Sequence, residues 1–452
     1  MISNLSERQI VKIWQHQLLD RTELATEEGE QIKIIYPGRM NDDQGADFRD
    51  AVIATSRGLT KGDIEIHVKS SDWQAHRHHH DQVYNQVILH VVMWHNAKAA
   101  TNLQDGRDVP VLALYKYIKG TISQWPDGVE SLPTLNIPCR KAAEHLATGV
   151  IAELLDNTGE ERFLAKAARF QADLAQMEAS QSLYQGIMGA LGYSKNKLPF
   201  LELARRLPIR ILESITRGKI SDEECLAQQQ ALLLGTAGLL PSQRQSRYQE
   251  NKLDDKWIDK LERLWASSLH TETMSSNAWH LFKVRPNNSP IRRLVAMSYL
   301  TLRYKRKGIF EELVNIAKEV PVSKGYHRLE KGLTVTTNGY WASHFDFGLG
   351  SRIRNQTLLG SRRAADIAVN VLLPFTFAWG QLTSQPELAK KALNLYYNYP
   401  KLAVNSVERH MREQLGLSSR LVNSARRQQG LVHIYNTLCT QGRCNCCPLR
   451  ET

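Results

Sequence analysis

The sequence lacks a long apolar run. Its 452 residues contain no stretch of about eighteen consecutive apolar residues, which a membrane-spanning helix needs. The first residues, MISNLSERQIVKIW, carry charges where a secretory signal peptide has its apolar stretch. We therefore expect a soluble, cytoplasmic protein.

Cysteine is scarce, and its distribution is uneven. Two of the six cysteines stand apart, at Cys139 and Cys225. The other four crowd together near the C-terminus, at Cys439, Cys444, Cys446 and Cys447. In a cytoplasmic chain such crowding suggests a metal site rather than disulfides, so we expect Zn²⁺ or an iron–sulfur cluster there, with Cys139 as a further candidate ligand. The alternative is an exposed tail that is sensitive to oxidation.

Acidic residues are outnumbered by basic ones. The chain has 58 Lys and Arg against 46 Asp and Glu, which gives a formal net charge of +12. This balance favours polyanionic partners, nucleic acid above all, although a generic basic surface is the alternative. With 42% hydrophobic residues the chain can bury a core, and its length predicts two or three domains.

Internal repeats and low-complexity tracts are also absent, and strand signals nearly vanish after about residue 140. The expected fold class is therefore α+β: an α/β N-terminal part, then a mostly α-helical region and a Cys-rich C-terminus. Two linker-like segments, 126–138 and 241–252, suggest a division into three parts. These parts are residues 1–125, 126–240 and 241–452.

Hydrophobic periodicity places the expected elements. In the first part we expect helices at 6–20 and 78–86, and strands at 31–36, 47–55, 63–69, 87–95 and 109–117. Ser6 is the expected N-cap of the first helix. Helical periods further along cover 143–177, 182–206, 222–235, 254–267, 290–318, 362–379, 386–397, 403–414 and 419–437.

Strand 63–69 carries an unusual set of polar side chains. Alternation puts Asp63, Glu65, His67 and Lys69 on one face and leaves the apolar residues between them for the core. Carboxylates crowded together repel unless a cation neutralises them, which points to a bound metal ion. The alternative is an edge strand with a solvated face.

A second carboxylate is expected beside this strand. Asp47 opens strand 47–55, so a hairpin with strand 63–69 would place it next to Glu65. Two carboxylates on adjacent strands can bind Mg²⁺ or Mn²⁺ through oxygen. Such an ion neutralises charge on a phosphate under attack, and a basic group on the same strand would orient the water or the phosphate.

This order of helix, strand, strand with Asp, strand with Glu-x-base, helix and strand resembles the PD-(D/E)xK nuclease superfamily. In the resemblance His67 stands where the pattern has lysine, and Lys69 lies one pleat further along. Glu7 fits the acidic residue that many members carry on the first helix. The resemblance implies a restriction-endonuclease-like α/β core with a central mixed sheet. It also implies catalysis by Asp47, Glu65, His67 and Lys69, with Mg²⁺ or Mn²⁺ held by Glu7, Asp47 and Glu65.

Histidines crowd the segment that follows. SDWQAHRHHHDQVYNQVILHVV, residues 71–92, is similar to the His-rich region of very-short-patch mismatch-repair endonucleases. Such histidines could act as general base, as acid for the leaving group or as phosphate donors, and the alternative is loop and cap residues. The candidate substrate-binding residues are His76, His78, Asp81, Tyr84 and Asn85.

Blocks along nearly the whole chain resemble an uncharacterised bacterial family, a domain of unknown function. They include GADFRDA, GDIEIHVKSSDW, LLLGTAGLLP, RPNNSPIRRL and the terminal RCNCCP. This second resemblance implies no activity, so the functional prediction depends on the nuclease pattern.

Together these patterns predict a metal-dependent nuclease that hydrolyses phosphodiester bonds, in DNA rather than RNA. Arg292 and Arg293 in the helical region are candidate phosphate contacts, or else ordinary surface arginines. Because Ala46 stands where the superfamily has proline, and because His67 replaces lysine, one alternative is a nucleic-acid-binding protein with a degenerate, inactive nuclease core. The other is a structural zinc or iron–sulfur protein. The oligomeric state and the mode of cleavage, endo or exo, are left open.

Overall fold

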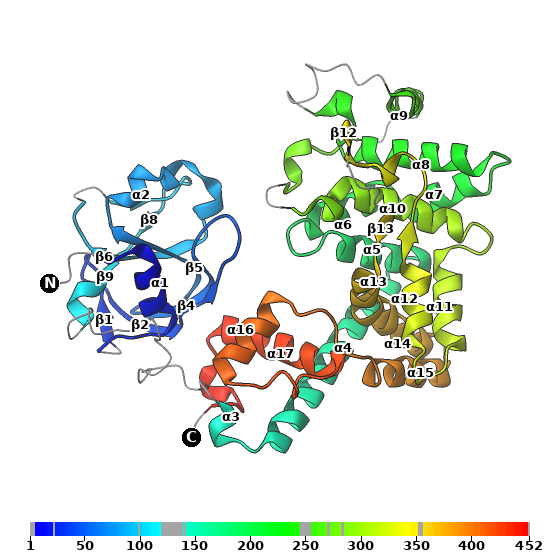
Figure 1. The fold of residues 1–452 in the computed structure, drawn as a ribbon. Helices are drawn as coiled ribbons and strands as arrows, with labels where there is room; N and C mark the ends of the chain where they lie inside the picture. The colour runs from blue at the N-terminus through cyan, green and yellow to red at the C-terminus, as the bar shows by residue number, and fades with distance from the viewer. Residues whose placement is uncertain are drawn as a thin grey trace. The chain divides into compact units, whose positions relative to one another are not determined.

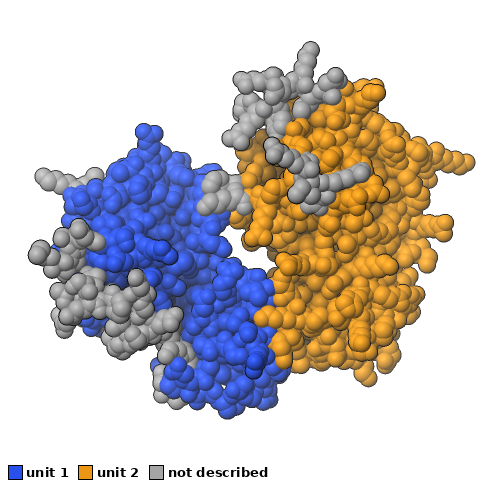
Figure 2. All heavy atoms as spheres, viewed as in Figure 1, with its two compact units in different colours: residues 1–159, 404–422, 427–452 blue, residues 160–403, 423–426 orange. Residues whose placement is uncertain are grey.

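The computed structural model describes most of the chain (Figure 1). The described residues are 5–20, 23–97, 100–118, 139, 142–244, 255–268, 272–281, 284–350 and 356–450. The chain forms two compact units, coloured in Figure 2: unit 1 is residues 1–159, 404–422 and 427–452, and unit 2 is residues 160–403 and 423–426. The predicted linker 126–138 lies outside the described residues, and the predicted division into three parts stays a prediction.

Unit 1 is built around a mixed sheet, as predicted. The sheet has seven strands in the order β1-β2-β4-β5-β6-β9, with β3 paired to β4. Neighbours from β1 to β5 are antiparallel, whereas β6 is parallel to both β5 and β9. The strands are β1 (Glu23–Ala25), β2 (Gln31–Tyr36), β3 (Arg39–Met40), β4 (Phe48–Thr55), β5 (Gly58–Lys69), β6 (Val87–Trp94) and β9 (Val111–Ala113). A separate ribbon pairs β7 (Thr101–Asn102) with β8 (Asp108–Val109).

The α1 helix (Glu7–Gln15) covers one face of this sheet. Ser6 is its N-cap, as predicted, and the Ser6 N–H donates to Gln9 Oε1 at 2.9 Å. The apolar residues of α1 share a core with Ile64 and Ile66 of β5. Because side chains alternate along a strand, the polar residues of β5 are left for the opposite face.

The helix predicted over 78–86 is wrong. After the single turn of α2 (Asp72–Ala75), the chain forms two 3₁₀ turns, η1 (His78–His80) and η2 (Gln82–Tyr84). Asp81 separates them, because its carboxylate accepts a hydrogen bond from the nearby Val83 N–H at 3.0 Å. Such a local bond competes with the hydrogen bonds of a helix.

The strand predicted over 109–117 is wrong in its second half. The observed strand β9 ends at Ala113, and the chain continues as the 3₁₀ turn η3 (Leu114–Tyr117). Periodicity alone does not distinguish a short apolar strand from a buried helical turn. In this turn the Tyr117 hydroxyl accepts a hydrogen bond from the Ala25 N–H of β1 and donates one to the Ala25 carbonyl oxygen.

The C-terminal segments of unit 1 pack against the sheet. They comprise α16 (Ser406–Leu415), α17 (Ala425–Thr437), η11 (Cys439–Gln441) and η12 (Cys444–Cys446), and they join α3 (Ala142–His145) and the start of α4 (Thr148–Leu174). A C-terminal core joins Tyr36 of β2 and Val52 of β4 to Ile151, Met411 and Tyr435. The end of the chain therefore helps to hold the N-terminal sheet in place.

Unit 2 is mostly helical, as predicted. Its remaining helices are α5 (Ala179–Leu191), α6 (Lys197–Arg206), α7 (Ile209–Thr216), α8 (Asp222–Thr236), α9 (Lys256–Ala266), α10 (Pro290–Arg303), α11 (Ile309–Glu319), α12 (Tyr326–Leu333), α13 (Ser361–Ile367), α14 (Leu373–Leu382) and α15 (Pro386–Tyr397). Two small ribbons pair β10 (Val335–Thr336) with β13 (Thr357–Leu359) and β11 (His344–Asp346) with β12 (Leu349–Gly350). Among the described residues, no helix has both the length and the apolar character that crossing a membrane requires.

Arg292 and Arg293 are not surface residues. Arg292 is 0% exposed and Arg293 is 4% exposed. Arg292 donates to the backbone carbonyl of Trp341, and Arg293 to that of Leu358, each at 2.6 Å. These arginines therefore satisfy buried carbonyls and stabilise unit 2, so they do not contact a substrate.

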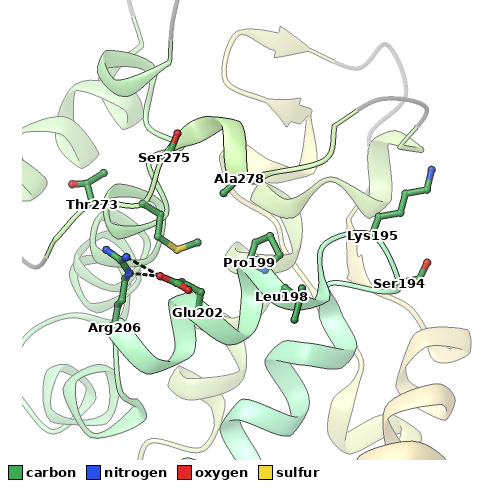
Figure 3. Close-up of a pocket in the computed structure, with 10 residues that line it drawn as sticks. Ser194, Lys195, Leu198, Pro199, Glu202, Arg206, Thr273, Ser275 and Ala278 are labelled. Carbon is green, nitrogen blue, oxygen red and sulfur yellow. Dashed lines mark hydrogen bonds and ion pairs between the residues drawn. The ribbon is translucent and has the colours of Figure 1, made fainter. Parts of the chain in front are cut away.

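An open hollow of about 570 Å³ lies on unit 2 beside α6 (Figure 3). Glu202 and Arg206, one turn apart on this helix, pair at 2.7 Å in its wall. The other lining residues are Ser194, Lys195, Leu198, Pro199, Thr273, Met274, Ser275 and Ala278. Because this acid and base neutralise each other, we place no chemistry there.

Candidate active site

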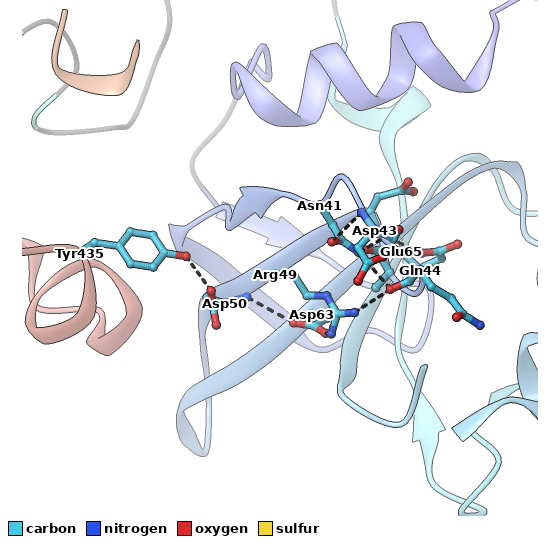
Figure 4. A network of polar contacts seen from close by, with 10 residues as sticks. Asn41, Asp43, Gln44, Arg49, Asp50, Asp63, Glu65 and Tyr435 are labelled. Carbon is cyan, nitrogen blue, oxygen red and sulfur yellow. Dashed lines mark hydrogen bonds and ion pairs between the residues drawn. The ribbon is translucent and has the colours of Figure 1, made fainter. Parts of the chain in front are cut away.

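A tight loop that contains Asn41, Asp43 and Gln44 precedes β4 (Figure 4), and Asp47 is the last residue before this strand. The Asn41 N–H donates to the carbonyl oxygen of Asp47 at 2.7 Å, and Asn41 Nδ2 donates to that of Ala46 at 2.9 Å. Arg49 Nη2 donates to the Gln44 carbonyl oxygen at 2.9 Å. The loop is therefore held by its own residues, and it places Asp47 without help from a ligand.

Gly45 offers a test of this loop. Its φ is +96°, and a Cβ there would lie 2.6 Å from Val83 Cγ1 and 2.7 Å from Arg49 Nη2. We expect Gly45→Ala to lower the free energy of unfolding by about 2–4 kcal/mol, because it strains the backbone and crowds two side chains. Gly106→Ala is the matched control: φ is +87° but no atom lies within 4 Å of its Cβ. For Gly106→Ala we expect the free energy of unfolding to fall by about 1 kcal/mol. Equal losses in urea denaturation would show that the packing of the loop is unimportant.

Asp47 and Glu65 lie side by side, as the predicted hairpin requires. The Asp47 N–H donates to Glu65 Oε2 at 3.1 Å, and Asp47 Oδ2 accepts from the Ile66 N–H at 3.0 Å. Burial, and then repulsion from Glu65, raises the pKa of Asp47 to about 7. Burial raises the pKa of Glu65 to about 8, although the Asp47 N–H lowers it in part. Without a cation neither acid is therefore fully ionised at neutral pH.

A β-bulge on β4 lies opposite Asp63 of β5. The register of β4 on β5 shifts between Phe48 and Ala51, and Asp50 in the bulge has a φ of +63°. Arg49 Nη1 lies 2.8 Å from Asp63 Oδ2, and the Asp50 N–H donates to Asp63 Oδ1 at 3.2 Å (Figure 4). Asp63 is thus paired with an arginine, whereas Glu65 and His67 on the same strand belong to the buried group beside Asp47.

Lys69 does not join the buried group either. It is the last residue of β5 and is exposed, and its backbone N–H donates to Asp72 Oδ2 at 3.0 Å. The predicted catalytic role of Lys69 therefore has no support from the position of its side chain. Its exposed amine could still contact a substrate that covers the site.

His67 lies at the centre of a histidine network. His67 Nε2 is 3.5 Å from Glu65 Oε1 and shares a hydrogen bond of 3.1 Å with His76 Nδ1. On the other side of the ring, His67 Nδ1 shares a hydrogen bond of 2.9 Å with His90 Nε2. Burial, and then neighbouring His90, lowers the pKa of His67 to about 2. His67 is therefore a neutral imidazole, unlike the cationic lysine of the nuclease pattern.

His78 directs a buried ring nitrogen toward Glu65, as His67 does. Its Nε2 lies 3.2 Å from Glu65 Oε1, but the angles do not make a hydrogen bond, and this atom has no partner among the described residues. Burial lowers the pKa of His78. The ring is held by Tyr84, with ring centroids 3.8 Å apart. A buried ring nitrogen without a partner, next to a carboxylate, fits a metal ligand.

Three ring nitrogens form the metal-capable group of this site. One ligand atom each from His67, His76 and His78 lie within 4.8 Å of one another. Glu65 contacts two of these histidines, and Glu7 on α1 is close enough to raise the pKa of both Asp47 and Glu65. The predicted residues Glu7, Asp47, Glu65, His67, His76 and His78 thus converge.

Two predicted substrate-binding residues have local roles, and one residue was missed. Asp81 is occupied in capping η2, and Asn85 donates to Gln104 Oε1 at 3.1 Å. His90 lies in the histidine-rich segment but was not among the candidate substrate-binding residues, and it links His67 to Thr101 Oγ1, 3.3 Å from His90 Nδ1. The signal was available, because His90 interrupts a strand of otherwise apolar residues.

Residues 7–403 match a family model with the description "Protein of unknown function (DUF2851)". The match covers most of the chain and confirms the resemblance to a domain-of-unknown-function family. No curated protein and no solved structure matches the chain.

Proposed function

The chain belongs to the DUF2851 family, described as of unknown function, and we propose that it is a metal-dependent nuclease that hydrolyses phosphodiester bonds in DNA. The observation that carries this proposal is the acid pair, half-buried Asp47 and buried Glu65, beside the histidine group. Two adjacent acids with raised pKa values need a cation if both are to be ionised at neutral pH.

The donor atoms suit a mixed oxygen and nitrogen site. Asp47 and Glu65 would supply oxygen, and His67, His76 and His78 would supply nitrogen. Mg²⁺ prefers oxygen alone, so this set favours Mn²⁺ or a neighbouring transition ion. When bound, such an ion would stabilise charge on the phosphate and lower the pKa of its water.

The order of elements supports the resemblance to PD-(D/E)xK nucleases. Helix α1 precedes the antiparallel strands β2, β4 and β5, and β6 then pairs with β5 in parallel. Asp47 comes directly before β4, whereas Glu65 and His67 lie on β5. We therefore propose that unit 1 contains a restriction-endonuclease-like core.

In this proposal each side chain has a separate role. Asp47 and Glu65 hold the ion, and His90 orients His67 so that its Nε2 faces the site. Exposed cations beside the site, Lys69 and Arg77, would contact the phosphates of the substrate. The net charge of +12 suits such a substrate.

An inactive core that only binds nucleic acid is the second candidate. The observation that favours it is His67, which is neutral where the nuclease pattern has a cation. Cleavage of supercoiled plasmid and single-stranded DNA, with Mn²⁺ or Mg²⁺ and with EDTA as the blank, decides between the two. Cleavage that requires Mn²⁺ supports the nuclease, and DNA binding without cleavage supports the inactive core.

Metal binding should also stabilise the protein. We expect Mn²⁺ at about 100 times its dissociation constant to raise the free energy of unfolding by about 2.7 kcal/mol, because the ion binds only the folded site. His78→Ala should lose most of this gain, because it removes the ring nitrogen that has no other partner. His80→Ala is the matched control, since His80 is an exposed neighbour outside the metal-capable group. The prediction fails if both variants respond to Mn²⁺ as the wild type does in thermal melting.

A further inference from the structure

Basic side chains of unit 2 gather beside α13. The Arg363 guanidinium carbon lies 3.1 Å from the centre of the Tyr193 ring, and Arg363 Nη1 lies 3.3 Å from Asp366 Oδ2. The Tyr193 hydroxyl accepts a hydrogen bond from Arg293 Nη2 at 3.0 Å. Arg293 is buried, whereas Arg363 is partly exposed. Tyr193 therefore joins a buried arginine to one that solvent can reach.

A lysine of α4 reaches the same helix. Lys166 Nζ donates to Asn370 Oδ1, and Asn370 Nδ2 donates to the Asp366 carbonyl oxygen at 2.9 Å. Asn370 belongs to a π-helical turn, Ala368–Leu372, which follows α13 directly. Since Asp366 also contacts Arg363, these bonds link Lys166 to Arg363 through two shared neighbours.

Helix α4 adds two more cations on the same side. Arg162 stands four residues before Lys166 and Arg169 three residues after it, so the three side chains share one face of the helix. Arg162 and Lys166 are half-buried, and Arg169 is exposed. Burial, and then repulsion from neighbouring cations with Arg162 first, lowers the pKa of Lys166 well below its usual value, although Asp366 raises it in part. A bound anion would favour the charged form of this lysine.

The backbone is distorted at two points around these cations. Tyr193 has a φ of +54°, a conformation that few residues other than glycine adopt. The turn Ala368–Leu372 is π-helical, which is rare and often marks a functional site. The first distortion places the ring that stacks on Arg363, and the second places the amide that contacts Lys166. Strained segments cluster where a ligand is held, and these two meet at the charged side chains.

Arg363 has donor capacity that the fold does not use. Asp366 takes up one of its nitrogens, Nη1, whereas Arg363 Nε is buried and has no hydrogen-bond partner among the described residues. A buried donor without a partner costs free energy, which a ligand oxygen would recover. Arg293 is occupied with the Leu358 carbonyl oxygen, with Tyr193 and with Asn288, so it supports the site from below and does not contact the ligand.

We propose that Arg162, Lys166, Arg169 and Arg363 form a strip on unit 2 that binds phosphates of the DNA backbone. The guanidinium fork of arginine matches the oxygens of a phosphate, and lysine adds a point charge. Tyr193 and Asn370 position Arg363 and Lys166. The choice of DNA as the ligand rests on the proposed function, but binding to this strip needs neither cleavage nor the metal ion.

The length of the strip favours a polymer over a free phosphate ion. Arg162 and Arg169 are seven residues apart on α4. At a rise of about 1.5 Å per residue they are separated by about 10 Å along the helix. One phosphate group cannot contact both of them, whereas successive phosphates of a nucleic-acid strand can.

The test measures DNA binding by the full chain in EDTA, with fluorescence anisotropy of a labelled duplex. We expect Arg363→Gln and Lys166→Gln each to weaken binding at least about tenfold and to lower the salt slope by roughly one. Arg217→Gln is the matched control: it removes an exposed arginine at the end of α7 and should change affinity less than about twofold. Absence of DNA binding by the wild type, wild-type affinity in both glutamine variants, or an equal loss in Arg217→Gln overturns the proposal. A chain that binds DNA through the strip but cleaves none supports this inference and refutes the nuclease.

A third variant covers the case in which Arg363→Gln and Lys166→Gln do not fold. Arg169 is exposed, so Arg169→Gln should melt as the wild type does while DNA binding weakens about threefold and the salt slope falls by roughly one. Replacing chloride by inorganic phosphate at constant ionic strength should leave the DNA bound. Wild-type affinity and salt slope in Arg169→Gln, or displacement of the DNA by inorganic phosphate, contradicts a DNA-binding strip.

Discussion

Asp47→Asn or Glu65→Gln is expected to lower the rate of DNA cleavage at least about 100-fold, which corresponds to about 3 kcal/mol in the barrier. Each substitution removes a negative oxygen ligand but keeps the shape of the side chain. The remaining acid would still neutralise part of the charge of the ion, but it would no longer hold the ion in position. Initial rates at saturating Mn²⁺ measure the effect.

The controls separate a lost ligand from a lost fold. Near pH 8 the metal-free Asp47→Asn and Glu65→Gln variants should melt no lower than the wild type, because an amide removes the repulsion between two buried acids. Asp42→Asn is the matched control for activity, since Asp42 lies exposed in the same loop. If both amide variants are folded and cleave DNA at wild-type rates, Asp47 and Glu65 are not the metal site.

His67→Ala is expected to lower cleavage about 100-fold, whereas Lys69→Ala should lower it less than about threefold. His67 Nε2 meets Glu65 and His76 inside the site, and its ring is held by His90. Lys69 is exposed at the end of the strand, so its contribution is limited to a screened contact with phosphate.

The salt dependence provides a second readout for this comparison. Lys69→Ala should weaken DNA binding mainly at low salt and reduce the salt slope by roughly one, because one phosphate contact is lost. His67→Ala should leave DNA binding nearly unchanged and reduce the turnover rate. The opposite ranking of the two variants would mean that the lysine has taken over the catalytic position one pleat further along β5.

The acid pair was predictable because its geometry is local. A hairpin places the start of one strand beside the middle of the next, so Asp47 and Glu65 could be paired from alternation and chain order alone. The helices after about residue 140 could also be predicted, because apolar residues recur there with the helical period. Alternation did not reveal the bulge at Asp50. Next to this bulge Arg49 forms an ion pair with Asp63, whereas Glu65 contacts the histidines.

The histidine group shows the limit of local reasoning. The sequence crowds His76 and His78 behind the acidic strand, but a helix was expected there, and a helix would present them differently. The two 3₁₀ turns and the packing of Tyr84 on His78 orient the His78 ring toward Glu65, and His76 contacts His67. The neutral state of His67 is likewise a result of burial among other histidines, which a sequence does not display.

The sequence by itself determined the mixed sheet followed by a mostly helical region, the position of the acid pair and the family, because these depend on periodicity and on neighbours along the chain. Only the tertiary structure decided which side chains meet. It buried Cys139 and Cys439 in one core, although they are 300 residues apart in the sequence, and left Cys446 exposed. It also buried Arg292, which the sequence offered as a phosphate contact. Charge, protonation and ligand geometry depend on which side chains exclude water from one another, and the packing of distant segments decides this.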